Sequence, residues 1–302
     1  MTYHTHLDRR LIAPCLAACT LLAATPAPAA AQPTIQLTAV VRDFHAYGDP
    51  GGHPAMERDN MPAALAPRWV IGNLVHPRLG LDGKPNFTNN GIVVKVPWKD
   101  AAGRNIAPQM TPMPGDVPGV LTNAWNDYLD PASFRELFND VPGVNMSTAV
   151  TLTFNLQGDG TYLFDSQTDP TMGQPPGPKG FYPVDNLLFG NYSGNGGNRN
   201  YHFSFELHCQ FIYDAAAGQI FEFNGDDDVW VFINGRLVVD LGGRHSAKSM
   251  FVDMNRLGLA DGEVYRFDFF LMERRTNNSN CMITTNLPIE VNGDISISNA
   301  FD

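Results

Sequence analysis

Three consecutive aspartates, Asp226, Asp227 and Asp228, form the densest polar cluster in the sequence that could do chemistry. They lie between two apolar segments, residues 219–223 and 229–233, which we expect to be strands. Adjacent carboxylates repel one another, so a loop that holds three of them between buried strands usually needs a compensating cation. Ca²⁺ suits such a loop because it takes roughly six to eight oxygen ligands in flexible geometry. We predict that Asp226 and Asp227 bind Ca²⁺; a solvated acidic turn is the alternative.

The spacing of these aspartates does not match an EF-hand, which needs acidic residues at alternate positions, then a Gly and a closing Glu. Further ligands must therefore come from other loops. Residues 190–200 (GNYSGNGGNRN) and 273–280 (ERRTNNSN) are rich in amide side chains of the kind that read sugar hydroxyls. Besides Asp228, the candidate ligand contacts are Asn191, Tyr192, Asn277 and Asn280. The alternative for each segment is an ordinary flexible loop.

Signatures of other chemistry are missing from the sequence. His202 and His208 share one face of a predicted strand with Glu206, a face that we expect to be solvated, and they lie too far apart to bind one zinc ion. The chain has no H-E-x-x-H, G-x-S-x-G or phosphate-loop motif. Adjacent aspartates also differ from the two separated carboxyls of a glycosidase. We expect a protein that is not an enzyme.

The first 31 residues have the order of a secretory signal peptide. Arg9 and Arg10 precede the apolar run 11–24, and the small residues 29–31 follow as a cleavage site. Residues 16–19 also fit a lipoprotein box, which would leave a lipidated Cys19 as the mature N-terminus. No later apolar stretch approaches the roughly 20 residues of a spanning helix. We expect a secreted or cell-surface protein.

Removal of the signal leaves two cysteines, Cys209 and Cys281. An even number in an oxidising compartment predicts a disulfide between them. In the chain-entropy model, a crosslink that closes so long a loop stabilises the fold by roughly 4 kcal/mol. Two buried free thiols are the alternative.

The net charge of −11 and the acidic isoelectric point, about 5.0, argue against nucleic acid and anionic membranes as partners. Acidity of this kind favours solubility and carboxylate sites for cations.

The segments around the acidic loop alternate with period two, which predicts strands. Asn234-Gly235 between residues 229–233 and 237–241 is a strong hairpin signal. Asp130-Pro131 begins the one persuasive helix, which we expect to end near Asn139. The other predicted strands are residues 35–44, 91–98, 149–157, 201–213 and 264–272. This pattern favours a mainly β protein, an antiparallel β-sandwich or jelly roll with long loops. We expect one domain over residues 32–302, with a loop-rich half (32–147) and a sandwich core (148–292).

Four segments resemble the fibro-slime domain: IQLTAVVRDF at Ile35, NYHFSFELH at Asn200, FNGDDDVWVFINGRLVVDLGGRH at Phe223 and YRFDFFLMERRTNNSN at Tyr265. That family is similar to the β-sandwich lectin domain of protective antigen and of fungal flocculation adhesins. In the sugar-binding members of that wider group of lectin domains, two consecutive aspartates joined by a cis peptide bond hold the Ca²⁺ that contacts sugar hydroxyls. The resemblance places this pair at Asp226 and Asp227, with Asp228 next; the other calcium ligands lie in a loop without a match here.

The resemblance and the residues together predict an exported, non-catalytic adhesion protein that binds polysaccharide with the help of calcium. The alternative is a structural protein of the extracellular matrix or cell surface that binds another protein without calcium or sugar. An exposed aromatic side chain beside the acidic loop would favour the lectin, and Trp230 and Tyr192 are the candidates. The oligomeric state stays open.

Overall fold

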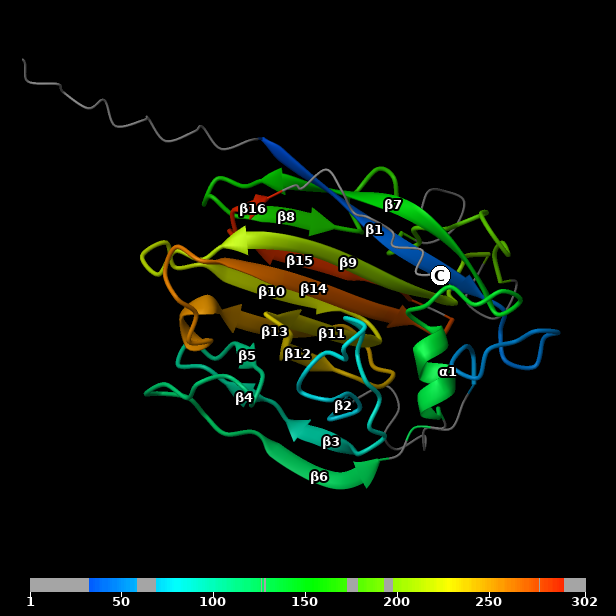
Figure 1. Ribbon diagram of the computed structural model, residues 1–302, viewed down its shortest axis with the longest axis horizontal. Coiled ribbons are helices and arrows are strands. Elements are labelled where there is room, and N and C mark those ends of the chain that lie inside the picture. Colours follow the sequence, from blue (N-terminus) through cyan, green and yellow to red (C-terminus); the bar gives the residue numbers. More distant parts are fainter. Residues whose placement is uncertain are drawn as a thin grey trace, which may run out of the picture. The chain divides into compact units, whose positions relative to one another are not determined.

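Antiparallel strands are the main secondary structure of the protein, as the alternating sequence pattern predicts (Figure 1). The computed structural model describes residues 33–58, 69–125, 127, 129–172, 179–192, 198–276 and 278–290. The strands are β1 (Thr34–Phe44), β2 (Val70–Gly72), β3 (Gly91–Val96), β4 (Trp98–Lys99), β5 (Asn105–Ile106), β6 (Val120–Trp125), β7 (Asn145–Leu156), β8 (Tyr162–Asp165), β9 (Phe203–Ile212), β10 (Ile220–Gly225), β11 (Asp228–Ile233), β12 (Arg236–Leu241), β13 (Lys248–Asp253), β14 (Val264–Glu273), β15 (Cys281–Thr285) and β16 (Ile289–Glu290). A 3-10 turn, η1 (Met254–Arg256), follows β13.

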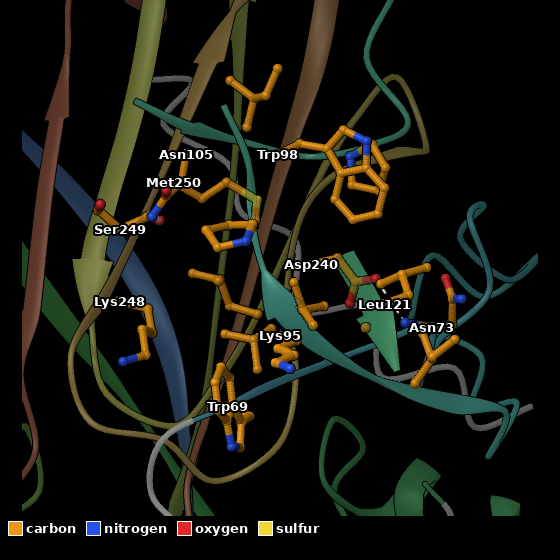
Figure 2. Close-up of a pocket in the computed structure, with 18 residues that line it drawn as sticks. Trp69, Asn73, Lys95, Trp98, Asn105, Leu121, Asp240, Lys248, Ser249 and Met250 are labelled. Carbon is orange, nitrogen blue, oxygen red and sulfur yellow. Dashed lines mark hydrogen bonds between the residues drawn. The ribbon is translucent and has the colours of Figure 1, made fainter. Parts of the chain in front are cut away.

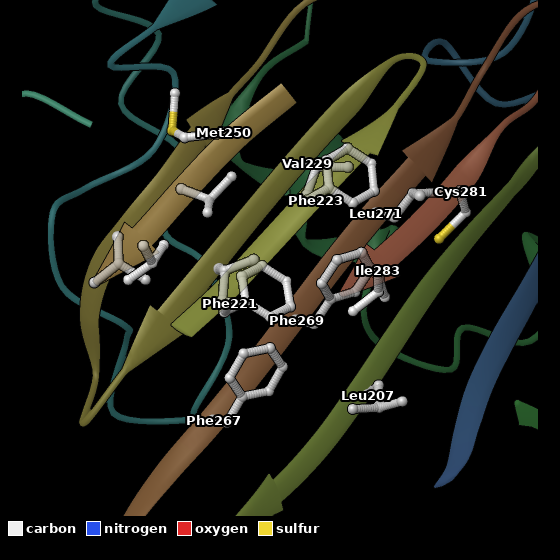
Figure 3. Close-up of a cluster of buried hydrophobic side chains, with 14 of the residues drawn as sticks. Leu207, Phe221, Phe223, Val229, Met250, Phe267, Phe269, Leu271, Cys281 and Ile283 are labelled. Atoms are coloured by element: carbon white, nitrogen blue, oxygen red, sulfur yellow. The ribbon is translucent and has the colours of Figure 1, made fainter. Parts of the chain in front are cut away.

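The large sheet has the strand order β12-β11-β14-β9-β1-β7-β8-β15-β10-β13, with β16 paired to β9. It folds over so that β10 faces β14 across an apolar core (Figure 3). There the rings of Phe221 and Phe267 lie 4.9 Å apart, and those of Phe223 and Phe269 lie 5.7 Å apart. Two layers of a sheet that bury their inner side chains against each other form a sandwich. The predicted antiparallel β-sandwich is therefore confirmed.

A second apolar cluster covers the outer face of β11 and β14. Trp230 and Phe270 project into it and pack edge-on against Phe134 and Phe138 of the helical segment. The face that we expected to be solvated is therefore buried, and Glu206 on β9 is only 3% exposed. The alternation predicted for β9 is correct, but the sequence period does not show which other segment packs on the polar face of the strand. Residues from the loop-rich half supply that cover.

The helix α1 (Pro131–Glu136) begins where the sequence predicts. The Asp130 carboxylate accepts hydrogen bonds from the backbone N–H groups of Ala132 and Ser133, and Pro131 occupies the first turn. It ends earlier than expected, because the Asn139 side chain donates to the Arg135 carbonyl and closes the last turn.

The hairpin between β11 and β12 also forms as predicted. Asn234 and Gly235 have φ values of 50° and 68°, the left-handed pair that a type I′ turn requires.

Two small sheets built from residues 70–125 lie beside β12 and β13. One has the order β2-β3-β6 and the other pairs β4 with β5. Only residues 91–98 were predicted as a strand in this region. The N–H of Ile71 donates to the carbonyl of Gly242 at 2.7 Å, and the Asn105 side chain donates to the carbonyl of Ser249 at 3.1 Å. These bonds fix the small sheets to the edge of the large one.

The predicted disulfide is wrong, because both cysteines are free thiols. Cys209 lies opposite Phe267, and Phe267 lies opposite Ile233, the last residue of β11. Cys281 lies opposite Gly225, which is close to the first residue of β11. At roughly 3.4 Å per residue β11 is about 17 Å long, whereas the Cα atoms of a disulfide lie within about 7 Å. An even cysteine count carries no information about this separation.

The predicted signal peptide and the alternative lipidation at Cys19 fall outside the described residues. Within the part of the chain that is described, no helix has the length and apolar character needed to cross a membrane.

Candidate functional site

The acidic loop is a very short connection between two strands of opposite layers. β10 ends at Gly225 and β11 begins at Asp228, so Asp226 and Asp227 alone make the crossing. Asp227 has a φ of 48°, a left-handed conformation that is uncommon for a residue other than glycine. The N–H of Asp226 donates to the carbonyl of Asn280, and the N–H of Asp227 donates to that of His245, each at 3.2 Å. The backbone of the loop is thus held from two sides.

Glycine at position 225 lets the chain before β15 lie directly against the acidic loop. A Cβ atom there would fall 2.2 Å from the carbonyl oxygen of Asn280. At Gly180 a Cβ would fall 2.4 Å from the carbonyl oxygen of Ser279. Two segments distant in sequence, 226–227 and 279–280, therefore meet because glycines leave room for them.

Asp226 contacts the side chain of Asn280, which donates from Nδ2 to Oδ2 of the carboxylate. The Asp226 side chain is nearly buried. Burial raises its pKa to about 6, the hydrogen bond from Asn280 opposes that rise, and the neighbouring charge of Asp227 adds to it. Two of the predicted site residues, Asp226 and Asn280, are thus in direct contact.

Glu273, the last residue of β14, adds a third carboxyl to this group. It is buried, and burial together with the charge of Asp227 raises its pKa well above the usual range. The N–H of Arg274 donates to Oδ2 of Asp227 at 3.2 Å, and the N–H of Arg275 donates to Glu273 at the same distance. Carboxyls held this close in a dry site favour a shared proton or a bound cation.

Asp228 has a different role from its two neighbours. Its side chain is fully buried and forms an ion pair with Arg274, whose Nε lies 2.8 Å from Oδ1. Arg274 also reaches Asp127, with 3.1 Å between Nη1 and Oδ2. Burial raises the pKa of Asp228 to about 7 against the opposing charge of Arg274. The Asp228 carboxylate is therefore not available to an external ligand.

The residues around Asp226 and Asp227 offer a mixture of oxygen ligands that suits calcium. Among the described residues, no three His, Cys, Asp or Glu side chains are arranged as a set of metal ligands. Calcium also accepts amide and backbone carbonyl oxygens. Asp226 and Asp227, with nearby backbone carbonyls, offer ligands of this kind. The Asn280 amide donates to Asp226 from its nitrogen and accepts from Gln167 at its oxygen, so it orients the Asp226 carboxylate. The raised pKa values of Asp226 and Glu273 indicate that a cation would relieve an unfavourable concentration of carboxyls.

The 190–200 loop uses its polar side chains internally where it is described. Asn191 accepts from the N–H of Asn186 at 2.6 Å and donates to the carbonyl of Asn198 at 3.0 Å. Tyr192 is half-buried and packs edge-on against His202, with 4.7 Å between ring centroids. Asn191 therefore supports the loop, whereas Tyr192 keeps part of its ring accessible.

Glu57 links this region to the acidic loop. His202 lies 3.1 Å from its carboxylate, which also accepts from the N–H and hydroxyl of Thr276 at 2.9 and 2.8 Å. The N–H of Glu57 donates to the carbonyl of Arg274 at 2.7 Å. Tyr192 and the aspartates are thus connected through His202, Glu57 and the start of the 274–280 segment.

Trp230 is fully buried in the second apolar cluster, so it does not serve as a surface platform for a sugar. Asn277 lies outside the described residues.

Sequence reasoning included Glu273 and Arg274 in a candidate segment but assigned no role to them, and it missed Glu57 and Asp127. Glu273 and Arg274 carried a usable signal, because two charged residues directly continue the buried run of β14. Glu57 and Asp127 carried none, since each is an isolated acidic residue in an irregular segment.

Comparison with known proteins identifies a PA14 domain over residues 154–298. Domains of this family are often carbohydrate-binding or adhesive. The matched segment contains the acidic loop, Glu273, Arg274 and Asn280.

The psi proteins of Dictyostelium discoideum are homologues of this chain. Protein psiJ is 40% identical over 190 residues, which cover 58% of this chain and 25% of psiJ. Protein psiD is 34% identical over 72% of this chain and 36% of psiD, and protein psiC is 30% identical over 85% of this chain and 42% of psiC. The chain therefore spans a quarter to two fifths of these relatives.

Two solved structures show weaker likeness. The PA14 domain of the MpAFP antifreeze protein is 16% identical over 30% of this chain and 45% of that chain, with a TM-score of 0.21. An anti-sigma factor domain-containing protein is 11% identical over 83% of this chain and 77% of that chain, with a TM-score of 0.22. At these TM-scores neither likeness bears on the fold.

Proposed function

We propose that this chain, which carries a PA14 domain and is homologous to the psi proteins, is an exported, non-catalytic module that binds extracellular carbohydrate with the help of calcium. Its segments resemble the fibro-slime type of such a domain, and that assignment is part of the proposal. The observation that carries it is the meeting of Asp226, Asp227 and Glu273, all buried, with the amide of Asn280. A buried group of three carboxyls, two of which have raised pKa values, is suited to a divalent cation.

Asp226 and Asp227 would hold the ion, with Asn280 orienting the Asp226 carboxylate, and bound calcium would supply coordination positions for sugar hydroxyls. The remaining residues fix this arrangement. Arg274 neutralises Asp228 and keeps it away from the ligand side, while its backbone N–H orients the Asp227 carboxylate. Gly225 allows the Asn280 segment to approach.

Tyr192 is the aromatic residue that this proposal assigns to sugar stacking. Its ring is half-buried, and His202 and Glu57 connect it to the 274–280 segment. Stacking on an exposed aromatic face contributes area at low entropic cost.

Export follows in this proposal from the signal-like residues 1–31. The free thiols do not oppose it. Burial raises the pKa of Cys209 to about 12 and that of Cys281 further, which keeps both protonated and unreactive at neutral pH.

A glycan panel probed with the mature protein tests the function. We expect binding in millimolar Ca²⁺ that disappears in EDTA and in the Asp226→Asn/Asp227→Asn variant. The matched control is Asp159→Asn/Asp261→Asn, which makes the same charge change at two exposed residues and should bind like the wild type. Binding that persists in EDTA contradicts the calcium-dependent mechanism, and a lack of binding to any glycan favours the protein-binding alternative.

A further inference from the structure

A cavity separate from the acidic loop lies where the small sheets meet the edge of the large one (Figure 2). Its volume is about 300 Å³, and strands β2 and β3 line one side while β12 and β13 line the other. No residue of the 226–228 loop or the 274–280 segment lines it. Whatever the cavity binds is therefore held by side chains that the proposed function does not use.

The walls of the cavity are mainly apolar, and two tryptophans contribute to them. Figure 2 shows Trp69 and Trp98 on different sides of the space, and Ile106, Leu121 and Met250 complete the lining between them. Both tryptophan side chains are only partly buried, so the cavity leaves aromatic surface uncovered. Flat aromatic and apolar walls favour a ring-shaped apolar ligand.

The surrounding contacts hold this shape in place without a ligand. Gly119 lies so close to the Trp98 ring that a Cβ atom there would fall 2.3 Å from Cε3. The Asn105 side chain donates to the carbonyl of Ser249 at 3.1 Å, which joins β5 to β13 across one end of the cavity. A pocket that is already formed binds a ligand with little ordering cost.

Asp240 supplies one polar group among these walls. It is 4% exposed, and its Oδ2 accepts from the N–H of Asn73 at 2.8 Å. Among the described residues, no partner makes a hydrogen bond of normal geometry with Oδ1. Burial raises the pKa of Asp240 to about 6, against the opposing influence of the Asn73 amide and the Trp230 indole. An acceptor left in a dry site gains from a ligand that donates to it.

Lys95 and Lys248 also line the cavity and set the charge that a ligand can carry. Two ammonium groups disfavour a cationic ligand, although the carboxylate would by itself attract one. A neutral ligand is repelled neither by the two ammonium groups nor by the carboxylate.

We infer that this cavity is a second binding site, which takes a neutral aromatic small molecule with one hydrogen-bond donor directed at Asp240. The size agrees, because the cavity has about twice the roughly 150 Å³ of an engineered cavity that accommodates benzene. Two fused rings with a hydroxyl group fit this description.

The probe that tests the site is 2-naphthol, with 2-methoxynaphthalene as the matched compound that lacks the donor. Binding is followed by NMR on the indole N–H signals of the four tryptophans, assigned by single Trp→Phe variants. We expect 2-naphthol to shift the signals of Trp69 and Trp98 in a saturable way. The methoxy compound should bind at least five times more weakly, because it offers Asp240 no proton.

Gly72→Leu fills the cavity without disturbing its frame. A Cβ atom at Gly72 would lie 3.4 Å from Oδ2 of Asp240 and 3.5 Å from Cγ2 of Val94, which are tolerable contacts. We expect at least a tenfold loss of affinity for 2-naphthol in this variant, with unchanged signals elsewhere. Asp226→Asn/Asp227→Asn should bind 2-naphthol like the wild type, which separates this site from the calcium proposal.

Three results would overturn the inference. The first is the absence of any shift at Trp69 and Trp98 up to the solubility limit of 2-naphthol. The second is equal affinity in the well-folded Gly72→Leu variant, since binding would then occur elsewhere. The third is equal affinity for the methoxy compound, since Asp240 would then not accept a bond from the ligand.

Discussion

Two groups of buried acidic side chains in this protein differ in how their charge is balanced. Glu206 on β9 is 3% exposed and lies 2.9 Å from Nη1 of Arg42, with Lys84 also in contact. Burial acts to raise its pKa, but the hydrogen bond from His208 and the charges of Arg42 and Lys84 outweigh that and lower it to about 2. This carboxylate is stable as an anion inside the protein.

The group around Asp226 is buried to a similar extent with the opposite result. Burial raises the pKa of Asp226 to about 6, and burial with the charge of Asp227 raises that of Glu273. Arg274, whose backbone N–H donates to Asp227, directs its side chain into ion pairs with Asp228 and Asp127.

The comparison teaches that burial of a carboxylate does not by itself indicate a function. A carboxylate with matched partners stabilises the fold, whereas a group of carboxyls in which burial and a neighbouring charge raise the pKa is a candidate binding site. Substitutions in the two groups should therefore act in opposite directions.

The largest effect is expected for Glu206→Gln. Loss of this charge leaves Lys84 without its counter-ion and Arg42 with Asp140 alone, so the free energy of unfolding should fall by about 3 kcal/mol. Urea denaturation measures it, and Glu263→Gln, an exposed position, is the control with little expected change. Equal stability of Glu206→Gln and wild type would contradict the structural role assigned to this group.

Gly225→Ala tests whether the acidic group depends on close approach of the Asn280 segment. The added Cβ would meet the Asn280 carbonyl at 2.2 Å and Phe223 at 2.5 Å. We expect a loss of about 2 kcal/mol together with weaker calcium binding, measured by denaturation and calorimetry. Gly158→Ala, where a Cβ meets nothing within 4 Å, should leave both unchanged. Calcium affinity that survives Gly225→Ala would show that the contact between Asn280 and Asp226 does not support the ion.

Glu273→Gln should have a smaller effect of opposite sign. Without calcium, replacing a carboxyl that burial and Asp227 disfavour with a neutral amide should raise the free energy of unfolding by about 1 kcal/mol. With calcium, the same change should weaken the stabilisation that the ion provides. Thermal unfolding in EDTA and in Ca²⁺ measures both, and destabilisation in EDTA would place Glu273 with Glu206 as a structural carboxylate.

The smallest expected effect is a difference in pH dependence. The folded-state pKa of Asp226, about 6, exceeds its ordinary value of 3.8, so its protonated form stabilises the fold below about pH 4 and that contribution is lost as pH rises through 6. Glu206 acts in reverse: its contribution is present above pH 4.5 and is lost as pH falls through about 2. In EDTA, the stability of wild type relative to Asp226→Asn should fall between pH 4 and 6. A relative stability that rises over this interval would contradict the raised pKa.

The sequence predicts much of the fold because the signals there are local. The alternation of β9 and β14, the Asn234-Gly235 turn and the Asp130 cap each depend on a few neighbouring residues, and each forms as expected. The acidic loop was found for the same reason, since its aspartates are consecutive.

The remainder depends on contacts between distant segments. Glu206 was expected in solvent because nothing in β9 shows that α1 and the residues around it cover that face. Cys209 and Cys281 were expected to pair because a count does not report strand register. The sequence does not distinguish Asp228 from Asp226 and Asp227, whereas the structure does, because Asp228 forms an ion pair with Arg274.

Calorimetric titration of the purified mature protein with Ca²⁺ tests the central claim most directly. We predict uptake at one site in the wild type and in Asp159→Asn/Asp261→Asn, and no uptake in Asp226→Asn/Asp227→Asn. Absence of calcium binding by the wild type at millimolar concentration, or equal binding by the Asp226→Asn/Asp227→Asn variant, would contradict the account and reduce the acidic loop to a structural turn.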